Sequence, residues 1–150
     1  MKLVEFLSPD EVSLELQAGT KDEALRELVG LLGLDAGSEE TLFKLLRKRE
    51  NLGSTGIGKH VAIPHCRSLV VDRLRVAYGR TSKGLEFDAI DGKPVHHLFL
   101  IVAPPVEISN QYLPVLGKIA QFCKEPTNLS RLDGVRTASE FFEAIERFTG

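Results

Sequence analysis

The stretch Gly53-Ser-Thr-Gly-Ile-Gly-Lys-His-Val-Ala-Ile-Pro-His-Cys-Arg67 combines three glycines, a short apolar run and a histidine that follows a proline. Glycine has no side chain, so its backbone N–H can approach an anion closely. Pro64 fixes its own φ angle and biases Ile63 toward an extended conformation, so His65 is presented from a stiff backbone. A rigid imidazole beside a glycine-rich segment is suited to accepting a phosphoryl group.

A nucleotide-binding P-loop is the first alternative for this stretch. Residues 53–59 read G-x-x-x-x-G-K, but His60 stands where that motif requires Ser or Thr to hold magnesium. A P-loop also follows a buried strand, whereas the preceding segment 42–50 has its apolar residues at helical spacing. The later strand candidate 98–103 ends without an aspartate for the metal. These mismatches exclude a P-loop.

A metal site is the second alternative, because His60, His65 and Cys66 lie close together, with His96 and His97 further along the chain. Structural zinc sites usually have paired ligands in two clusters. This chain has only two cysteines, and neither belongs to a C-x-x-C pair. Adjacent His96 and His97 in a strand would point to opposite faces. We therefore expect no metal site, and we interpret His60, His96 and His97 as structural or exposed.

Residues 50–66 resemble the active-site signature of the phosphotransferase-system enzyme IIA domains of the fructose/mannitol type, and their most specific part is the core G-x-x-V-A-I-P-H. The nitrogen-related regulatory IIA proteins share this signature. The similarity continues through segments 71–80, 84–95 and 98–104, so it covers nearly the whole chain. The resemblance implies a phosphohistidine carrier with no bound cofactor.

The resemblance assigns roles to particular residues. It makes His65 the phosphorylated residue, commonly at Nε2. It places Arg49 near that histidine, where a planar and always charged guanidinium would neutralise phosphoryl oxygens; the alternative is that Arg49 belongs to an ordinary solvated basic face, 47–49. Ser54 and Thr55 would offer hydroxyl or backbone N–H groups to the phosphate, or serve only the local turn.

One position departs from the family pattern. Family members usually carry a second histidine at the start of the helix that follows the long strand, and the matching residue here is Tyr112. A phenol can donate a hydrogen bond to a phosphate, but it cannot carry a positive charge near neutral pH. We expect the Tyr112 ring to face His65, with slower transfer or a role as a sensor of phosphorylation. Cys66, where glycine is frequent in the family, is expected to be a small buried thiol.

The resemblance also implies the protein partners. A histidine-containing phosphocarrier protein would supply the phosphoryl group, which makes the chain a phosphotransferase component rather than a free-standing turnover enzyme. In a regulatory, nitrogen-type branch, phosphorylation would change binding to a regulated target protein. In a sugar-transport branch, the group would pass to a IIB domain for fructose- or mannitol-type uptake. A free-standing domain without a fused IIB domain or membrane segment favours regulation.

Strand and helix patterns interleave along the chain, which predicts an α/β fold: a single-domain sandwich with a mixed β-sheet flanked by helices. Thr20, with Glu23 three residues later, is typical of a capping box at the start of a helix. The expected strands are Val12 to Leu16, Leu74 to Thr81 and Val95 to Ala103. The expected helices run from Thr20 to Gly33, Ser38 to about Arg49, Tyr112 to Cys123, Thr127 to Leu132 and Ala138 to Phe148.

Composition agrees with one cytoplasmic domain over residues 1–150. A chain of 150 residues with 43% hydrophobic content can bury one sizeable core. No apolar run approaches the length needed to span a bilayer, so no membrane insertion is expected. Two cysteines without framework spacing favour a reducing compartment. A formal net charge of −2 offers little attraction to nucleic acid or to anionic membranes.

Overall fold

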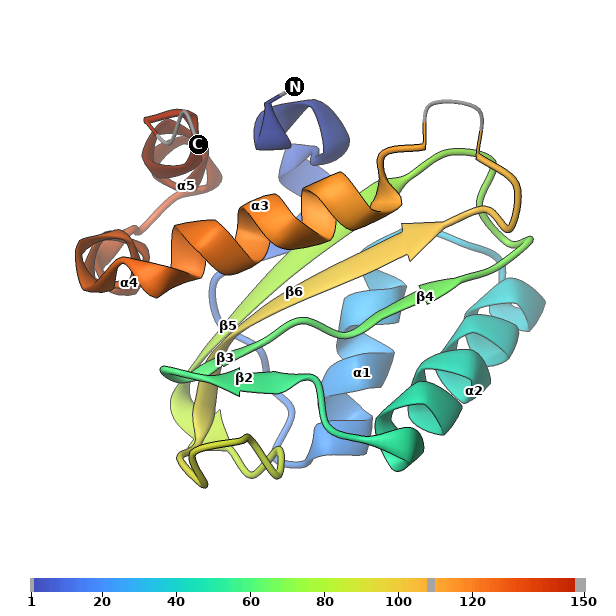
Figure 1. Ribbon diagram of the computed structural model, residues 1–150, viewed down its shortest axis with the longest axis horizontal. Coiled ribbons are helices and arrows are strands. Elements are labelled where there is room, and N and C mark those ends of the chain that lie inside the picture. Colours follow the sequence, from blue (N-terminus) through green and yellow to red (C-terminus); the bar gives the residue numbers. More distant parts are fainter. Residues whose placement is uncertain (1, 108–109, 148–150) are drawn as a thin grey trace.

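The computed structural model describes residues 2–107 and 110–147, and in this part of the chain a six-stranded sheet lies between two layers of helices (Figure 1). The strands are β1 (Val12–Ser13), β2 (Gly56–Gly58), β3 (Val61–Ala62), β4 (His65–Arg67), β5 (Arg75–Leu85) and β6 (Val95–Ala103). The helices are α1 (Lys21–Gly30), α2 (Ala36–Leu52), α3 (Tyr112–Lys124), α4 (Pro126–Gly134) and α5 (Ala138–Glu146), with the short 3-10 helices η1 (Leu3–Phe6) and η2 (Pro9–Glu11) at the start. The predicted α/β class is confirmed.

The sheet has the order β1-β5-β6-β3-β2, and β4 continues beside β6 after β3. β5 and β6 form an antiparallel centre in which Ala77 lies opposite Leu100. β1 pairs in parallel with β5, and both β3 and β4 pair in parallel with β6. β2 runs antiparallel to β3 at one edge. The sheet is therefore mixed, as predicted.

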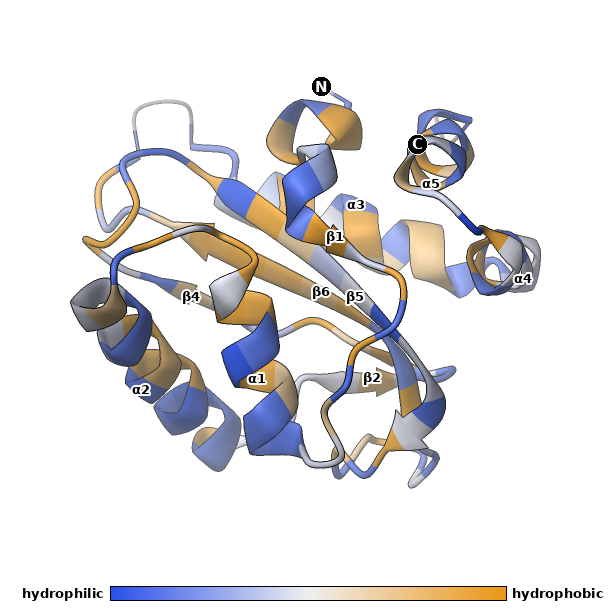
Figure 2. Ribbon diagram, turned by 180° about the vertical axis from the view of Figure 1, so that it is seen from behind, coloured by the Kyte–Doolittle hydropathy of each residue, from blue (hydrophilic) through white to orange (hydrophobic). Residues whose placement is uncertain are grey.

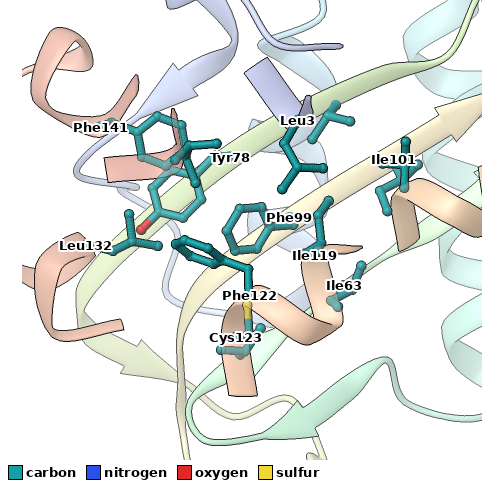
Figure 3. Close-up of a cluster of buried hydrophobic side chains, with 14 of the residues drawn as sticks. Leu3, Ile63, Tyr78, Phe99, Ile101, Ile119, Phe122, Cys123, Leu132 and Phe141 are labelled. Carbon is teal, nitrogen blue, oxygen red and sulfur yellow. The ribbon is translucent and has the colours of Figure 1, made fainter. Parts of the chain in front are cut away.

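Both faces of the sheet are covered by helices, α1 and α2 on one face and α3, α4 and α5 on the other (Figures 1 and 2). Successive side chains of β6 alternate between the two cores: Phe99 and Ile101 lie under α3, while Leu98 and Leu100 face α1 and α2. Because both faces are buried, this strand is a continuous apolar run from Leu98 to Ala103. Figure 3 shows the first core, in which the Tyr78 ring packs against aromatic neighbours.

Local capping explains where the first two long helices begin. The Thr20 side chain accepts a hydrogen bond from the Glu23 N–H at 3.2 Å, as predicted, and α1 starts at the next residue. The second helix starts two residues before the predicted Ser38, because Asp35 is its N-cap and accepts from the Ser38 N–H at 2.8 Å. It ends at Leu52, three residues beyond Arg49.

The strands differ more from their predicted bounds. β1 ends at Ser13 rather than Leu16, because the Leu14 carbonyl accepts from Arg80 Nε at 3.0 Å instead of from the backbone of β5. No strand is predicted in residues 53–67, the glycine segment, but this segment contains β2, β3 and β4. β3 and β4 form through pairing with β6, a contact distant in sequence that no local pattern reveals, and β2 in turn pairs with β3.

The other predicted boundaries differ by small amounts. β5 continues four residues past Thr81, to Leu85. α4 is longer than the predicted segment 127–132, because Pro126 is suited to its first turn. α5 begins after Thr137, whose side chain accepts from the Glu140 N–H, while the predicted end at Phe148 lies outside the described residues.

Candidate functional site

His65 is the first residue of β4 and lies beside the centre of the sheet, opposite Ile101 of β6. Pro64, immediately before it, has no N–H to donate, but its carbonyl accepts from the Ile101 N–H at 3.0 Å, so the pairing with β6 continues through the proline. β4 and the start of α3 lie at the same end of the sheet (Figure 1). The rigid placement of His65 therefore comes from both the proline and the sheet.

The tautomer of His65 follows from a single hydrogen bond. Its Nδ1 lies 2.7 Å from the carbonyl oxygen of Ile63. A carbonyl oxygen only accepts, so Nδ1 must carry the proton and donate it. In the neutral ring the lone pair is then on Nε2. Nε2 is therefore the nucleophilic nitrogen.

Tyr112, the first residue of α3, lies next to His65. The two ring centroids are 6.1 Å apart, and the ring planes are inclined by 58°. Burial raises the pKa of the Tyr112 phenol to about 12, although the charges of Arg67 and Arg49 oppose this shift. The phenol is therefore neutral near pH 7 and keeps a proton that it can donate. The predicted role of Tyr112 in phosphate binding stays a prediction.

Arg67 is a site residue that the sequence reasoning missed. Residues 65 and 67 of a strand point to the same face, so the guanidinium of Arg67 and the imidazole of His65 lie on one side of β4. The guanidinium carbon of Arg67 lies 4.4 Å from the centroid of the Tyr112 ring, a cation–π contact. This arrangement brings a permanent positive charge close to the ring beside His65. The i, i+2 spacing would have revealed Arg67 if β4 had been recognised as a strand.

Two further contacts hold Arg67 in place. Its Nη1 donates to the Pro104 carbonyl at 3.0 Å and lies 3.8 Å from Glu107 Oε1. The same Glu107 oxygen accepts from the Tyr112 N–H at 3.1 Å, which connects the arginine to the first turn of α3. A guanidinium has several N–H donors, so these contacts leave others for a bound anion.

Arg49, in the last turn of α2, is positioned by the glycine segment. Its Nη1 donates to the Gly53 carbonyl at 2.7 Å. Its positive charge opposes the rise in the pKa of the Tyr112 phenol. Two arginines from different elements thus contribute positive charge around Tyr112. The predicted contact of Arg49 with a phosphoryl group stays a prediction.

Ser54 and Thr55 use their hydroxyl groups within the protein. Ser54 Oγ donates to the Phe87 carbonyl at 2.5 Å and accepts from the Gly56 N–H at 3.0 Å. Thr55 donates through both its hydroxyl and its backbone N–H to the buried carboxylate of Glu50, which also pairs with Lys21 at 2.9 Å. A phosphate contact from these groups would require such bonds to break, and it stays a prediction.

The remaining histidines and the cysteine lie in other surroundings. Burial raises the pKa of the Cys66 thiol to about 12, so the thiol is protonated and unreactive near neutral pH. His60 and His96 pack against each other, and His97 is buried beside Tyr78. Within residues 2–107 and 110–147, no three His, Cys, Asp or Glu side chains are arranged to hold a metal ion.

The amino-acid sequence matches a known protein family. Residues 5–148 match the family described as "Phosphoenolpyruvate-dependent sugar phosphotransferase system, EIIA 2". The chain belongs to this family, as its resemblance to the enzyme IIA domains implied. In the part of the chain that the structure describes, no helix has the length and apolar character needed to cross a bilayer.

Individual relatives fall into two groups. The "Nitrogen regulatory protein" of Pseudomonas aeruginosa is 30% identical over 147 residues, 97% of this chain and 95% of that protein. The "PTS system fructose-specific EIIA component" of Haloferax volcanii is 36% identical over 113 residues, 73% of this chain and 72% of that protein. Among solved structures, Nitrogen Regulatory Protein IIA-Ntr from Neisseria meningitidis has a TM-score of 0.85 at 33% identity, covering 94% of this chain and 97% of that one.

Proposed function

We propose that this protein carries a phosphoryl group on Nε2 of His65, which it receives from a histidine-containing phosphocarrier protein. The observation that carries this proposal is the 2.7 Å hydrogen bond between His65 Nδ1 and the Ile63 carbonyl, because it leaves the lone pair on the other nitrogen. In the donor, a phosphohistidine holds the phosphoryl group through an N–P bond. The reaction transfers that group between two imidazoles of similar chemistry, so neither a cofactor nor a metal is needed.

In the transfer step, the lone pair of His65 Nε2 attacks the phosphorus atom, and the N–P bond of the donor breaks. The electron pair of that bond returns to the imidazole of the donor. The proton on His65 Nδ1 stays in its bond to Ile63, and the phosphorylated ring keeps the protonated form that is the better leaving group. The same hydrogen bond therefore supports both acceptance of the group and its onward transfer.

Side chains that surround His65 would stabilise the negative charge of the phosphoryl group. Phosphoryl transfer depends mainly on positioning and on neutralising charge on the equatorial oxygens. Arg67 is held on the same face of the strand as His65, and Arg49 supplies a second guanidinium within electrostatic range of Tyr112. The Tyr112 hydroxyl adds a neutral donor. Arg67 thereby provides the positive charge that a second histidine would supply in the family pattern.

The test is phosphorylation with purified components. Incubation with phosphoenolpyruvate, enzyme I and the phosphocarrier protein should add one phosphate that is labile in acid and stable in alkali, as expected for an N–P bond. His65→Ala should abolish the incorporation while the circular dichroism spectrum and the melting temperature stay close to those of the wild type. Phosphate retained by the folded variant would refute the assignment.

We also propose that the protein belongs to a regulatory branch of the phosphotransferase system. In this proposal, residues 1–150 form one cytoplasmic domain. Similarity over nearly the full length of the nitrogen regulatory proteins from P. aeruginosa and N. meningitidis supports this branch. Phosphorylation at His65 would then change binding to a regulated target protein. The alternative is a transport component that passes the group to a IIB domain, and the similarity to the fructose-specific protein of H. volcanii favours it.

Deletion of the gene distinguishes the two branches. In the regulatory branch, the deletion strain should still take up fructose and mannitol at the wild-type rate, because the protein lies outside the route of the sugar. Loss of uptake of either sugar, restored by the wild-type gene but not by the His65→Ala variant, would favour the transport branch and contradict the regulatory one.

A further inference from the structure

A cavity of about 350 Å³ is lined by residues at the start of β6, at the other end of that strand from the pairing with His65. Its walls come from the turn between β2 and β3, the start of β6, and one face of α4. His97, in this cavity, is four residues from Ile101 along β6, and Ile101 is the residue that pairs with His65. Four residues of a strand span roughly 13 Å. The cavity is therefore separate from the phosphoryl-transfer site, and its volume is typical of small-molecule sites.

The turn that forms one wall has an unusual backbone. Lys59 and His60 have φ angles of 55° and 67°, the left-handed region that glycine or asparagine adopts with less strain. The His60 carbonyl accepts from the N–H groups of both His96 and His97, at 2.9 and 3.0 Å, which holds the turn against β6. Positive φ at both residues is common in two-residue turns that join antiparallel strands, as β2 and β3 are joined here. Here the turn places a lysine and a histidine on the cavity wall.

The inner end of the cavity is a buried hydrogen-bonded chain that phosphoryl transfer does not use. His97 is 2% exposed, its Nε2 lies 2.8 Å from Asp133 Oδ1, and its Nδ1 lies 2.7 Å from the Tyr78 hydroxyl. A carboxylate only accepts, so Nε2 carries the proton, and Nδ1 accepts from the tyrosine. With the His97 imidazole neutral, all three groups have a hydrogen-bond partner. It also fixes the orientation of the Asp133 carboxylate, whose side chain is 65% exposed at the cavity.

The remaining lining residues define the chemistry of a ligand. Lys59 and Lys93 contribute two positive charges, against the single carboxylate of Asp133. Lys59 Nζ donates to the Lys124 carbonyl at 2.9 Å, but an ammonium group has further protons to donate. Pro126 and Leu129 form an apolar wall on α4. The cavity thus offers cations for an anionic group, an acceptor for a donor group, and an apolar surface.

We infer that this cavity binds a small organic anion, one that carries a phosphate or carboxylate group for Lys59 and Lys93 and a hydroxyl or amino group for Asp133. A sugar phosphate and a hydroxy acid are the two sources of this chemistry. The inference rests on the lining and its hydrogen bonds, and it does not depend on phosphorylation of His65.

The experiment follows the backbone amide NMR signals of the full chain during titration with four probes: glucose 6-phosphate, citrate, inorganic phosphate and glucose. We expect glucose 6-phosphate or citrate to produce saturable shifts at residues 59–60, 96–97 and 129–133 in the millimolar range or below. The double variant Lys59→Ala/Lys93→Ala should weaken that binding at least about tenfold, a loss comparable to one charge-assisted contact. Lys83→Ala, which removes an exposed lysine of β5, should leave it unchanged.

The four probes distinguish which kind of anion the cavity binds. A response to glucose 6-phosphate alone assigns a phosphate ester, and a response to citrate alone assigns a carboxylate. Equal responses to glucose and to glucose 6-phosphate would contradict the role of the lysines. Binding of inorganic phosphate as strong as that of both organic anions would contradict the role of Asp133 and the apolar wall. Absence of shifts at these residues with every probe, or shifts unaffected by the double variant, would overturn the inference.

Discussion

On β4, His65 and Arg67 lie two residues apart and share one face of the strand, with the ring of Tyr112 next to both. A neutral imidazole can attack phosphorus, but it cannot at the same time neutralise the phosphoryl oxygens. A neighbouring guanidinium can do so without any change of protonation state. The proposed function assigns the attack to His65 and the neutralisation to Arg67, and each role can be tested by substitution.

The first prediction concerns Arg67. We expect Arg67→Ala to slow phosphorylation of His65 on the order of 100-fold, because it removes a positioned donor for the developing charge. Arg67→Lys keeps the charge but loses the planar group that packs on Tyr112, so it should recover only part of the rate. The measurement is the rate of phosphate incorporation from the phosphorylated carrier protein.

Arg73→Ala serves as the matched control for this prediction. Arg73 is an exposed arginine in the turn before β5, and its removal changes the net charge of the protein by the same amount. If Arg73→Ala slows the reaction as much as Arg67→Ala, the effect reflects general electrostatic attraction of the carrier protein, and the specific role of Arg67 is wrong.

The second prediction concerns Tyr112. Tyr112→His would introduce a group that can become cationic, so transfer should become faster below about pH 7, where imidazole gains its proton. Tyr112→Phe removes only the hydroxyl, and it should slow transfer by less than Arg67→Ala does. Rates measured between about pH 6 and 8 test both variants. A Tyr112→His profile that parallels the wild type would show that this position does not act on the phosphoryl group.

At the scale of elements, caps decide where helices start, and their effect can be measured. Thr20 accepts from the Glu23 N–H at the start of α1, and Glu23 in turn accepts from the Gly19 N–H at 3.1 Å. Thr20→Ala should lower the free energy of unfolding by about 1 kcal/mol. Thr41→Ala, an exposed position inside α2, should not lower it, because alanine has the higher helix propensity. Urea unfolding followed by circular dichroism compares them, and equal losses would contradict the capping role.

The glycine segment shows how elements far apart in sequence position the site. Glu50, at the end of α2, binds Thr55 at the start of the segment and Lys21 at the start of α1. The Ser54 hydroxyl donates a hydrogen bond to the carbonyl of Phe87, which follows β5. These contacts fix the entry of the segment into the sheet. Some polar residues of the signature thus maintain the shape of the segment.

At the scale of the whole molecule, buried His97 links the central sheet to α4 and makes stability depend on pH. Burial lowers the pKa of His97 below its ordinary value of 6.5, although Asp133 opposes this shift. The folded protein therefore binds this proton less readily than the unfolded chain. The stability from His97 is present in full above about pH 6.5 and is lost as the pH falls through the lowered folded pKa.

We expect the wild type to lose more free energy of unfolding between about pH 7 and 5 than His97→Gln, which cannot titrate. Tyr78→Phe removes the hydroxyl that donates to His97 Nδ1 but keeps the imidazole. This variant should therefore be less stable than the wild type at every pH and should retain the pH dependence. Urea unfolding at several pH values measures all three proteins. Identical pH dependence in the wild type and His97→Gln would show that His97 is not the titrating group.

The amino-acid sequence alone predicted the fold class, most helices and the family of this protein, because the strongest signals were local. The capping pattern at Thr20, the apolar run of β6 and the Pro64-His65 pair each depend on neighbours within a few positions, and the signature around His65 indicated the family. Three features depend on how segments distant in sequence pair and pack: the short strands of residues 53–67, the contact of Arg67 with Tyr112, and the cavity beside α4. Those contacts form only when distant parts of the chain meet, so only the tertiary structure decided them.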